Sequence, residues 1–196
     1  TVGGSQKGLM CPPGLSFNAI SNKAMEANKA SKLTKSYFDW GEMLENNKNG
    51  FYPYTPAVNL LYGLNESINM LLEESLENVF ARHKRLADAT RLAVEAWGLE
   101  ILAKNPIERS DSITAIMVPN GHDSDNLRKI IYDNYDMSLG TGLNKVKGKV
   151  FRIGHMGDLN DLMLAGTLAG VEMGLKQSGI PFKPGGIMAA LNFLSK

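Results

Sequence analysis

The amino-acid sequence predicts a mixed α/β fold, and two observations indicate it. Residues 56–98 show a helical repeat of apolar side chains, and residues 99–179 then alternate between strand and helix signals. Such alternation is typical of a sheet covered by helices, whereas a helical bundle would keep the helical period throughout. With 43% hydrophobic and 21% charged residues among 196, the composition is that of an ordinary globular protein.

The first fifty residues are predicted to be rich in loops. The turn signals are the pair Gly3-Gly4, the run Pro12-Pro13-Gly14 and the polar stretch 45–50. Glycine and proline are the strongest interruptions of regular structure, so we expect short connections here. Between the turns, the alternation over residues 15–20 predicts one short strand.

Two long helices are predicted over residues 56–98. The first begins after Pro56, and its apolar residues recur three or four apart: Val58, Leu61, Leu64, Ile68, Leu71 and Leu72. This spacing places them on one helix face. The second helix is expected to begin at a cap near Ser75 and to end at Gly98, because serine caps helix starts and glycine favours helix ends.

The remaining chain is predicted to form a small α/β layer. The expected strands are residues 99–103, 112–118 and 149–154, and a helix is expected to begin after Asp123 or Ser124. A last helix is expected to begin after Asp158 and to end at Gly179. Three glycines recur every four residues on this helix, which indicates close packing: Gly166, Gly170 and Gly174.

Charge and hydropathy exclude several classes of function. The formal charge is +1, so no overall field favours nucleic acid or anionic lipid, and we expect neither as a partner. The basic run 82–85 is interpreted as a solvated helix face. No apolar run reaches the roughly 20 residues of a membrane helix. Cys11 is the single cysteine, which fits a reducing compartment, and we expect a cytoplasmic location.

Lys7 is the first candidate for chemistry. It lies between Gly3-Gly4 and Gly8, in a segment where the backbone can approach a ligand closely. A lysine amine condenses with an aldehyde when its pKa is lowered by burial or by another positive charge. Considered alone, however, a lysine in such a segment is more often a solvated surface residue.

Arg152 is the second candidate. Alternation along residues 149–154 places Phe151 and Ile153 on one face of a strand and Arg152 on the other. A guanidinium there could hold a carboxylate through two parallel hydrogen bonds. The pattern by itself favours an ordinary salt bridge over a substrate site.

Two hydroxyl residues before the first long helix, Tyr52 and Thr55, form a third candidate. Hydroxyls beside a helix N-terminus can bind a phosphate, but an aromatic anchor and a threonine cap are equally good interpretations. His83 falls on an apolar helix stripe and is interpreted as a satisfied core histidine. The other histidines are too scattered to predict a metal site, and we expect none.

Four separated segments resemble the class V aminotransferases, which use pyridoxal phosphate. They are residues 4–15, 49–56, 148–155 and 168–174, so the resemblance spans essentially the whole chain. Within that family the sequence is most similar to the serine-glyoxylate branch, with alanine-glyoxylate and serine-pyruvate enzymes as near relatives. The resemblance implies an α/β fold that corresponds to the C-terminal half of a fold-type I transferase.

The resemblance also implies roles for five residues. Lys7 matches the lysine that binds pyridoxal phosphate as a Schiff base and moves a proton during catalysis. Gln6 matches a ligand of the cofactor phosphate, while Tyr52 and Thr55 match a pair that reaches the phosphate of the neighbouring subunit. Arg152 matches the arginine that binds the substrate carboxylate. The implied reaction is amino transfer from serine or alanine to glyoxylate, which gives glycine and hydroxypyruvate or pyruvate.

The resemblance implies a division of the chain and an incomplete active site. Residues 1–55 would be the remnant of the cofactor-binding large domain, residues 56–98 the interdomain helices, and residues 99–196 the small C-terminal domain. The half that supplies the partner of the pyridine nitrogen would be missing, so we expect a homodimer with shared sites or a separate N-terminal half. The alternative is a non-catalytic dimerisation or interaction module derived from such an enzyme.

Overall fold

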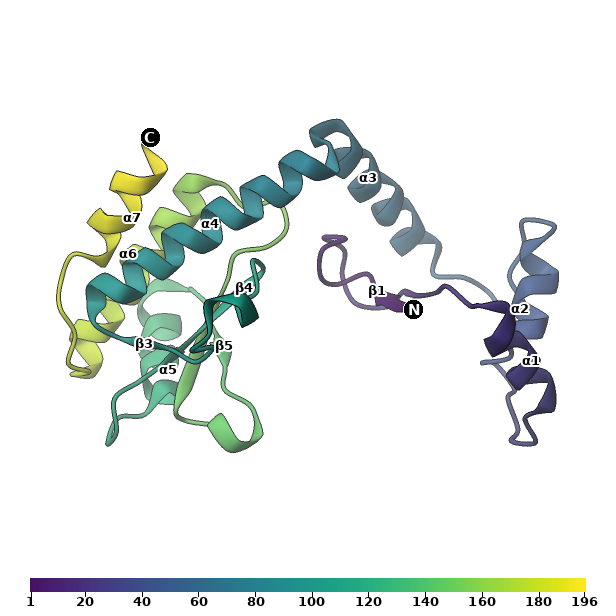
Figure 1. The fold of residues 1–196 in the computed structure, drawn as a ribbon, viewed down its shortest axis with the longest axis horizontal. Helices are drawn as coiled ribbons and strands as arrows, with labels where there is room; N and C mark the ends of the chain where they lie inside the picture. Colours follow the sequence, from purple (N-terminus) through teal and green to yellow (C-terminus); the bar gives the residue numbers. More distant parts are fainter. The chain divides into compact units, whose positions relative to one another are not determined.

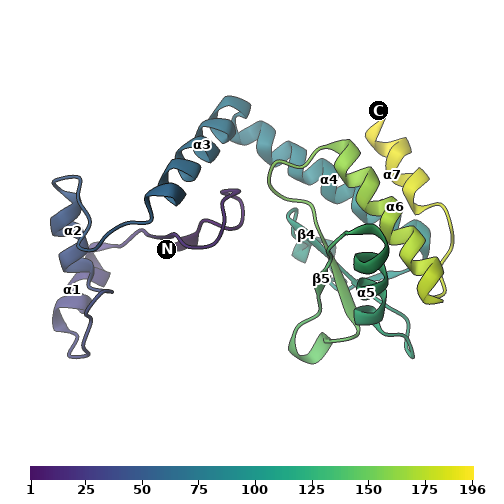
Figure 2. The same ribbon diagram turned by 180° about the vertical axis from the view of Figure 1, so that it is seen from behind.

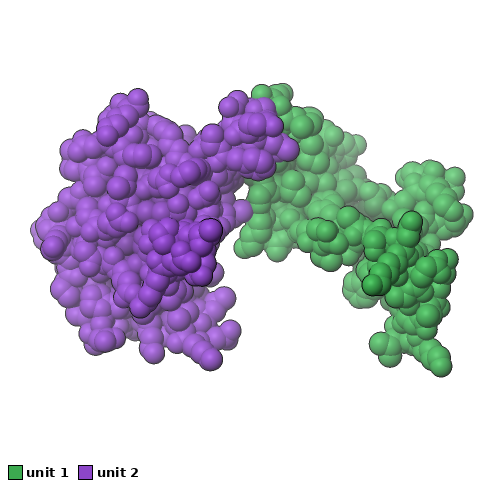
Figure 3. Space-filling model, in the orientation of Figure 1, with its two compact units in different colours: residues 1–73 green, residues 74–196 purple.

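A computed structural model describes all 196 residues and divides the chain into two compact units. The first comprises residues 1–73 and the second residues 74–196 (Figure 3). None of the helices combines the length and the hydrophobicity that a membrane span requires.

The first unit contains a small hairpin and three helices (Figure 1). Strands β1 (Val2–Gly4) and β2 (Ser16–Asn18) pair in antiparallel fashion, with Gly3 opposite Phe17. The predicted strand over residues 15–20 is therefore confirmed as β2. Its partner β1 includes the pair Gly3-Gly4, which the sequence indicated only as a turn.

Two helices occupy the region that was predicted to be rich in loops. They are α1 (Asn22–Ala30) and α2 (Trp40–Asn47), and neither has a buried residue. The loop prediction was wrong here. These helices bury no residue, so no apolar stripe marks them in the sequence, and their first turns are instead stabilised by side-chain caps. Ser21 accepts a hydrogen bond from the N–H of Ala24, and Asp39 accepts one from the N–H of Gly41.

The predicted long helices are confirmed. Helix α3 (Val58–Glu74) buries Ser67 and Leu71, and the Ser67 hydroxyl donates to the carbonyl of Leu9. Helix α4 (Leu76–Trp97) begins after the Ser75 cap and ends at Gly98, which has the left-handed φ of 72° typical of such a stop.

The second unit contains a four-stranded antiparallel sheet in the order β3-β4-β6-β5. Its strands are β3 (Glu100–Ile101), β4 (Ile113–Met117), β5 (Gly140–Thr141) and β6 (Val150–Gly154). The helices are α4, α5 (Ser124–Tyr135), α6 (Asp161–Ser178) and α7 (Gly186–Leu194), with short 3₁₀ turns at Pro106–Glu108 and Asn144–Val146 (Figures 1 and 2).

The core of this unit lies on one face of the sheet. Ile116 and Phe151 are directly opposite on β4 and β6, and both are completely buried among residues of the four helices. Ala115 and Arg152, also opposite each other, lie on the other face and are only half-buried. The alternation along β6 therefore separates Arg152 from the core as the sequence predicted.

The glycine spacing on α6 produces close packing at two of three positions. A Cβ added to Gly170 would lie 2.6 Å from Met137, and one on Gly174 would lie 2.3 Å from Ile131. Gly166 has no neighbour within 4 Å and is exposed. The sequence did not predict α7, because Gly185 and Gly186 at its start are more typical of a loop.

Candidate functional site

An ordered turn carries Lys7. The buried Ser5 hydroxyl donates to the carbonyl of Pro12 at 2.7 Å and accepts from the N–H of Leu15 at 3.3 Å. The N–H of Cys11 donates to the Ser5 carbonyl at 3.0 Å, and the N–H of Met10 donates to the Lys7 carbonyl at 2.9 Å. These bonds fix the backbone, while the Lys7 side chain is exposed and makes no hydrogen bond.

Gln6 occupies the same turn. Its carboxamide oxygen lies 2.9 Å from the position that a Cβ on Gly4 would take, so the glycine leaves room for this side chain beside the backbone. The side chain is exposed and free of hydrogen bonds within the chain. An exposed amine and an exposed amide therefore project from one ordered turn.

Tyr52 and Thr55 line a shallow hollow formed by residues 50–56. Neither Gln6 nor Lys7 lines this hollow, so the chain does not bring the hydroxyl pair to the lysine there. The Thr55 hydroxyl makes no hydrogen bond, and α3 begins only at Val58. The interpretation of Thr55 as the cap of that helix is therefore wrong.

Arg152 lies between two neighbours in the sheet, Ala115 on β4 and Gly140 on β5. It makes no ion pair, so the salt-bridge alternative is wrong for this chain. Its Nε is buried and has no hydrogen-bond partner. A buried donor without a partner costs about 1–3 kcal/mol. Arg152 thus keeps its guanidinium uncommitted on the open face of the sheet, as an anion site requires.

Two of the three histidines, His83 and His155, form hydrogen bonds within the fold. The Nδ1 atom of His83 lies 2.7 Å from the carbonyl oxygen of Val79. Its Nε2 atom accepts a hydrogen bond from the N–H of Gly157 at 3.0 Å. The prediction that His83 is satisfied is confirmed, but His83 is half-buried and does not belong to the core. His155 is completely buried, and burial lowers its pKa to about 4. The hydrogen bond with the Asp111 carbonyl raises this pKa, but by less than burial lowers it. No three His, Cys, Asp or Glu side chains gather as a metal site would require.

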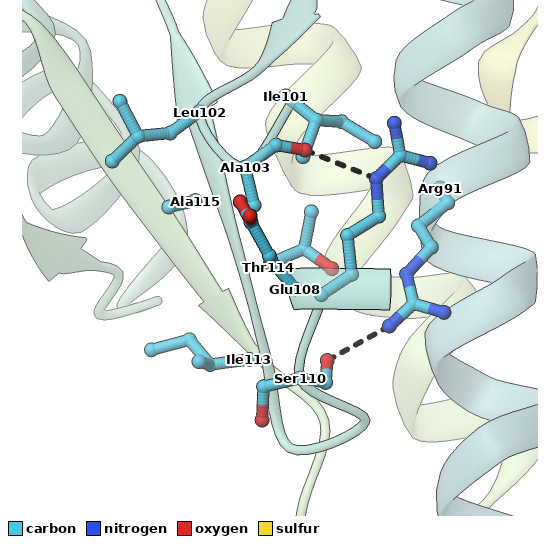
Figure 4. Close-up of a pocket in the computed structure, with 10 residues that line it drawn as sticks. Arg91, Ile101, Leu102, Ala103, Glu108, Ser110, Ile113, Thr114 and Ala115 are labelled. Carbon is cyan, nitrogen blue, oxygen red and sulfur yellow. Dashed lines mark hydrogen bonds between the residues drawn. The ribbon is translucent and has the colours of Figure 1, made fainter. Parts of the chain in front are cut away.

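A second hollow lies between α4 and the segment that connects β3 to β4 (Figure 4). No sequence pattern indicated this hollow. Arg91 donates there to the Ser110 carbonyl at 2.8 Å and forms ion pairs with Asp88 and Asp111. Arg109 donates through Nε to the Ala103 carbonyl at 3.1 Å. Because these contacts tie the connecting segment to α4 and close it on itself, we assign the hollow a structural role.

Comparison with known proteins gives the family context. No family model matches the chain. It is 49% identical over 198 residues to a serine–glyoxylate aminotransferase of Hyphomicrobium methylovorum, covering 100% of this chain and 49% of that enzyme. It is 48% identical over 189 residues to an L-aspartate–glyoxylate aminotransferase of Paracoccus denitrificans, covering 96% of this chain and 48% of that protein.

A solved structure supports the same relationship at the level of the fold. The crystal structure of pyridoxamine–pyruvate aminotransferase from Mesorhizobium loti matches with a TM-score of 0.90 and 31% identity, covering 99% of this chain and 51% of that one. The chain thus spans about half the length of the relatives it matches. Its sequence and its α/β fold are similar to one half of these class V aminotransferases, which is consistent with the expected C-terminal half.

Proposed function

We propose that this chain is the C-terminal part of a pyridoxal-phosphate-dependent enzyme that transfers the amino group of serine to glyoxylate. The products would be hydroxypyruvate and glycine, and alanine would be a second donor that gives pyruvate. The observation that carries the proposal is Arg152, whose guanidinium is unpaired on the open face of the sheet. In a chain so similar to aminotransferases, the carboxylate of an amino or oxo acid is the ligand that suits it.

Each candidate residue receives a role in this proposal. Bound pyridoxal phosphate would supply an electron sink for the negative charge at the substrate α-carbon. Lys7 would hold the cofactor and move the proton at that carbon. The Gln6 amide would bind the phosphate, while the hydroxyls of Tyr52 and Thr55 would bind the phosphate of a neighbouring subunit. Arg152 would orient the substrate by its carboxylate.

The proposal includes the assembly and the location. The site would be completed by a second copy of the chain or by an N-terminal half, and the three segments 1–55, 56–98 and 99–196 would be the large-domain remnant, the interdomain helices and the small domain. A cytoplasmic location agrees with the single cysteine, Cys11.

The test uses the product of the complete reading frame. Serine and glyoxylate should be converted at a measurable rate, and Lys7→Ala should abolish both the turnover and the visible absorbance of the bound cofactor. Arg152→Gln should keep the absorbance and raise the KM of both substrates about 100-fold or more, since a charge-assisted pair is lost. Unchanged KM values in Arg152→Gln would contradict the proposed role of Arg152.

The amino donor is the part of the proposal that Arg152 does not decide. A guanidinium binds the carboxylate of serine, alanine and aspartate alike. Serine is preferred because the similarity to the serine–glyoxylate enzyme spans the whole chain. Initial rates with the three donors at equal concentration test the choice, and faster turnover with aspartate would overturn it.

The second candidate is a non-catalytic interaction module. It is favoured by exposed aromatic side chains of the first unit, where Tyr37 contacts both Phe38 and Tyr54 with ring centroids 5.0 Å apart. Such side chains are typical of surfaces that bind a partner. Under this second candidate function, we expect the 196-residue chain to associate with itself and to bind no pyridoxal phosphate. Light scattering and absorbance titration of the purified chain distinguish the two candidates.

A further inference from the structure

Arg152 lies in a slot of the sheet that exists because residue 140 is glycine. Gly140 is directly opposite Arg152 in the antiparallel pair of β5 and β6. A Cβ added to Gly140 would lie 3.0 Å from the Arg152 Cβ and 3.1 Å from its Nε. These distances are shorter than ordinary carbon contacts of about 3.5–4.0 Å. A side chain at position 140 would therefore compete with the arginine for the same space.

The backbone around Gly140 is fixed on both sides. The Arg128 Nε on α5 donates to the Leu139 carbonyl at 2.8 Å, and the Thr141 hydroxyl donates to Asp125 Oδ1, also on α5, at 3.0 Å. Arg128 Nη1 pairs with the same Asp125 oxygen at 3.0 Å. Because α5 holds β5 at these two points, an added methyl group would displace the Arg152 side chain, together with the β6 backbone that carries its Cβ, rather than β5.

The slot determines which nitrogens of Arg152 can meet a ligand. The Nε is buried and has no partner, so a ligand cannot reach it without moving the side chain. We propose that Gly140 is a positioning residue for Arg152. It holds the stem of the arginine in the sheet, so that a substrate carboxylate binds end-on through the two terminal nitrogens. The carboxylate part of this inference rests on the function proposed above.

The first test measures the slot without any ligand. In ¹⁵N-labelled chain, the Nε–H signal of Arg152 is identified by its absence in Arg152→Lys. Its exchange with water should be slow in the native chain and about tenfold faster in Gly140→Ala, which moves the Nε out of the slot. Gly154→Ala is the matched control, because Gly154 lies two residues along β6 on the same face and has no neighbour within 4 Å. Its Nε–H exchange should equal that of the native chain.

The second test adds sodium glycolate, a carboxylate that cannot transaminate, and follows the backbone amide signals of β5 and β6, which every variant retains. Gly140→Ala should weaken glycolate binding about fivefold or more while Gly154→Ala leaves it unchanged. In an Arg152→Lys background, Gly140→Ala should have no further effect, as expected of a residue that acts through Arg152. Should Gly140→Ala fold poorly, Thr141→Val releases β5 from Asp125 without added bulk and should also speed the Nε–H exchange.

The outcomes separate this inference from the proposed function. Native exchange and native glycolate affinity in Gly140→Ala would overturn the role of Gly140 while Arg152 remained a carboxylate site. Absence of glycolate binding by the native chain would overturn the carboxylate part of both. The two tests on the chain could succeed while the complete enzyme shows no transaminase activity. That result would overturn the proposed reaction and leave the role of Gly140 established.

Discussion

His155 connects the end of β6 to the start of β4. Its Nδ1 lies 3.0 Å from the Asp111 carbonyl, and its Nε2 lies 2.9 Å from the Thr114 hydroxyl. A carbonyl only accepts, so Nδ1 carries the proton in the neutral ring and Nε2 accepts from the threonine. A second proton, on Nε2, would place a positive charge on the buried ring. It would also point an N–H at the Thr114 hydroxyl, which donates to Nε2 in the neutral state.

This arrangement predicts an acid-sensitive fold. The folded-state pKa of His155 is lowered from 6.5 to about 4 by burial, so the unfolded chain binds more protons between these values. The free energy of unfolding should therefore fall as the pH drops from above 6.5 towards 4, with about 2–3 kcal/mol due to His155. Urea unfolding at several pH values measures it.

The histidine variants isolate this contribution. His155→Gln should be less stable at neutral pH and should lose its share of the pH dependence, whereas His122→Gln should keep that share because the His122 ring makes no hydrogen bond. An identical dependence on pH in native chain and His155→Gln would contradict the assignment.

Among the elements, α7 depends on a cap supplied by another helix. Glu172 on α6 accepts from Trp97 Nε1 at 2.7 Å and from the N–H groups of Gly185 and Ile187 at 3.0 and 3.1 Å. Burial raises the pKa of Glu172, but these hydrogen bonds together outweigh burial, and the pKa lies below its ordinary value. A carboxylate at the start of a helix also interacts favourably with the helix dipole.

Glu172→Gln should destabilise the second unit by about 1.5–3 kcal/mol at pH 7, since a charged acceptor of three donors is lost. Because the folded pKa is lowered, the contribution of Glu172 is present above the unfolded pKa and disappears as the pH falls through the folded pKa. Urea unfolding followed by tryptophan fluorescence measures the effect. The exposed Glu95→Gln on α4 is the control and should change the stability by less than about 0.5 kcal/mol.

The glycines of α6 provide a second comparison at this scale. Gly174→Ala should cost about 1–3 kcal/mol, because its methyl group would overlap Ile131 and the core resists added volume. Gly166→Ala should instead stabilise the chain by about 0.5–1 kcal/mol through helix propensity. Thermal unfolding of both variants tests the pair, and equal effects would show that α6 packs differently.

For the whole molecule, the two units differ in their own burial. In residues 1–73 only Ser5, Cys11, Ser67 and Leu71 are buried, whereas residues 74–196 contain the hydrophobic core. Segments with few buried contacts open most readily. Limited proteolysis should therefore cut first within residues 19–50 and leave a resistant fragment that begins near Glu74, which mass spectrometry identifies. Early cleavage within 74–196 would contradict this.

A large part of the fold could be predicted from the sequence. The caps Ser75 and Gly98 set the ends of α4. The spacing of apolar residues identified α3 and α5 as helices and β6 as a strand. These signals act within a few residues, so they can be recognised in the sequence. Helices α1 and α7 could not be predicted in this way. The first buries no residue, so its start at Ser21 is not followed by an apolar stripe, and the N-terminus of the second is satisfied by Glu172 from another helix.

For the candidate site, the sequence alone determined the residue types, the face that Arg152 occupies and the family that its motifs resemble. These follow from strand alternation and from motif order, which are properties of the chain itself. Only the tertiary structure decided that Arg152 has no ion pair, that its Nε is buried, and that Gly140 makes the space for it. The reason is that β5 and β6 meet through strand pairing, so the contact between residues 140 and 152 depends on a register that local sequence patterns do not encode.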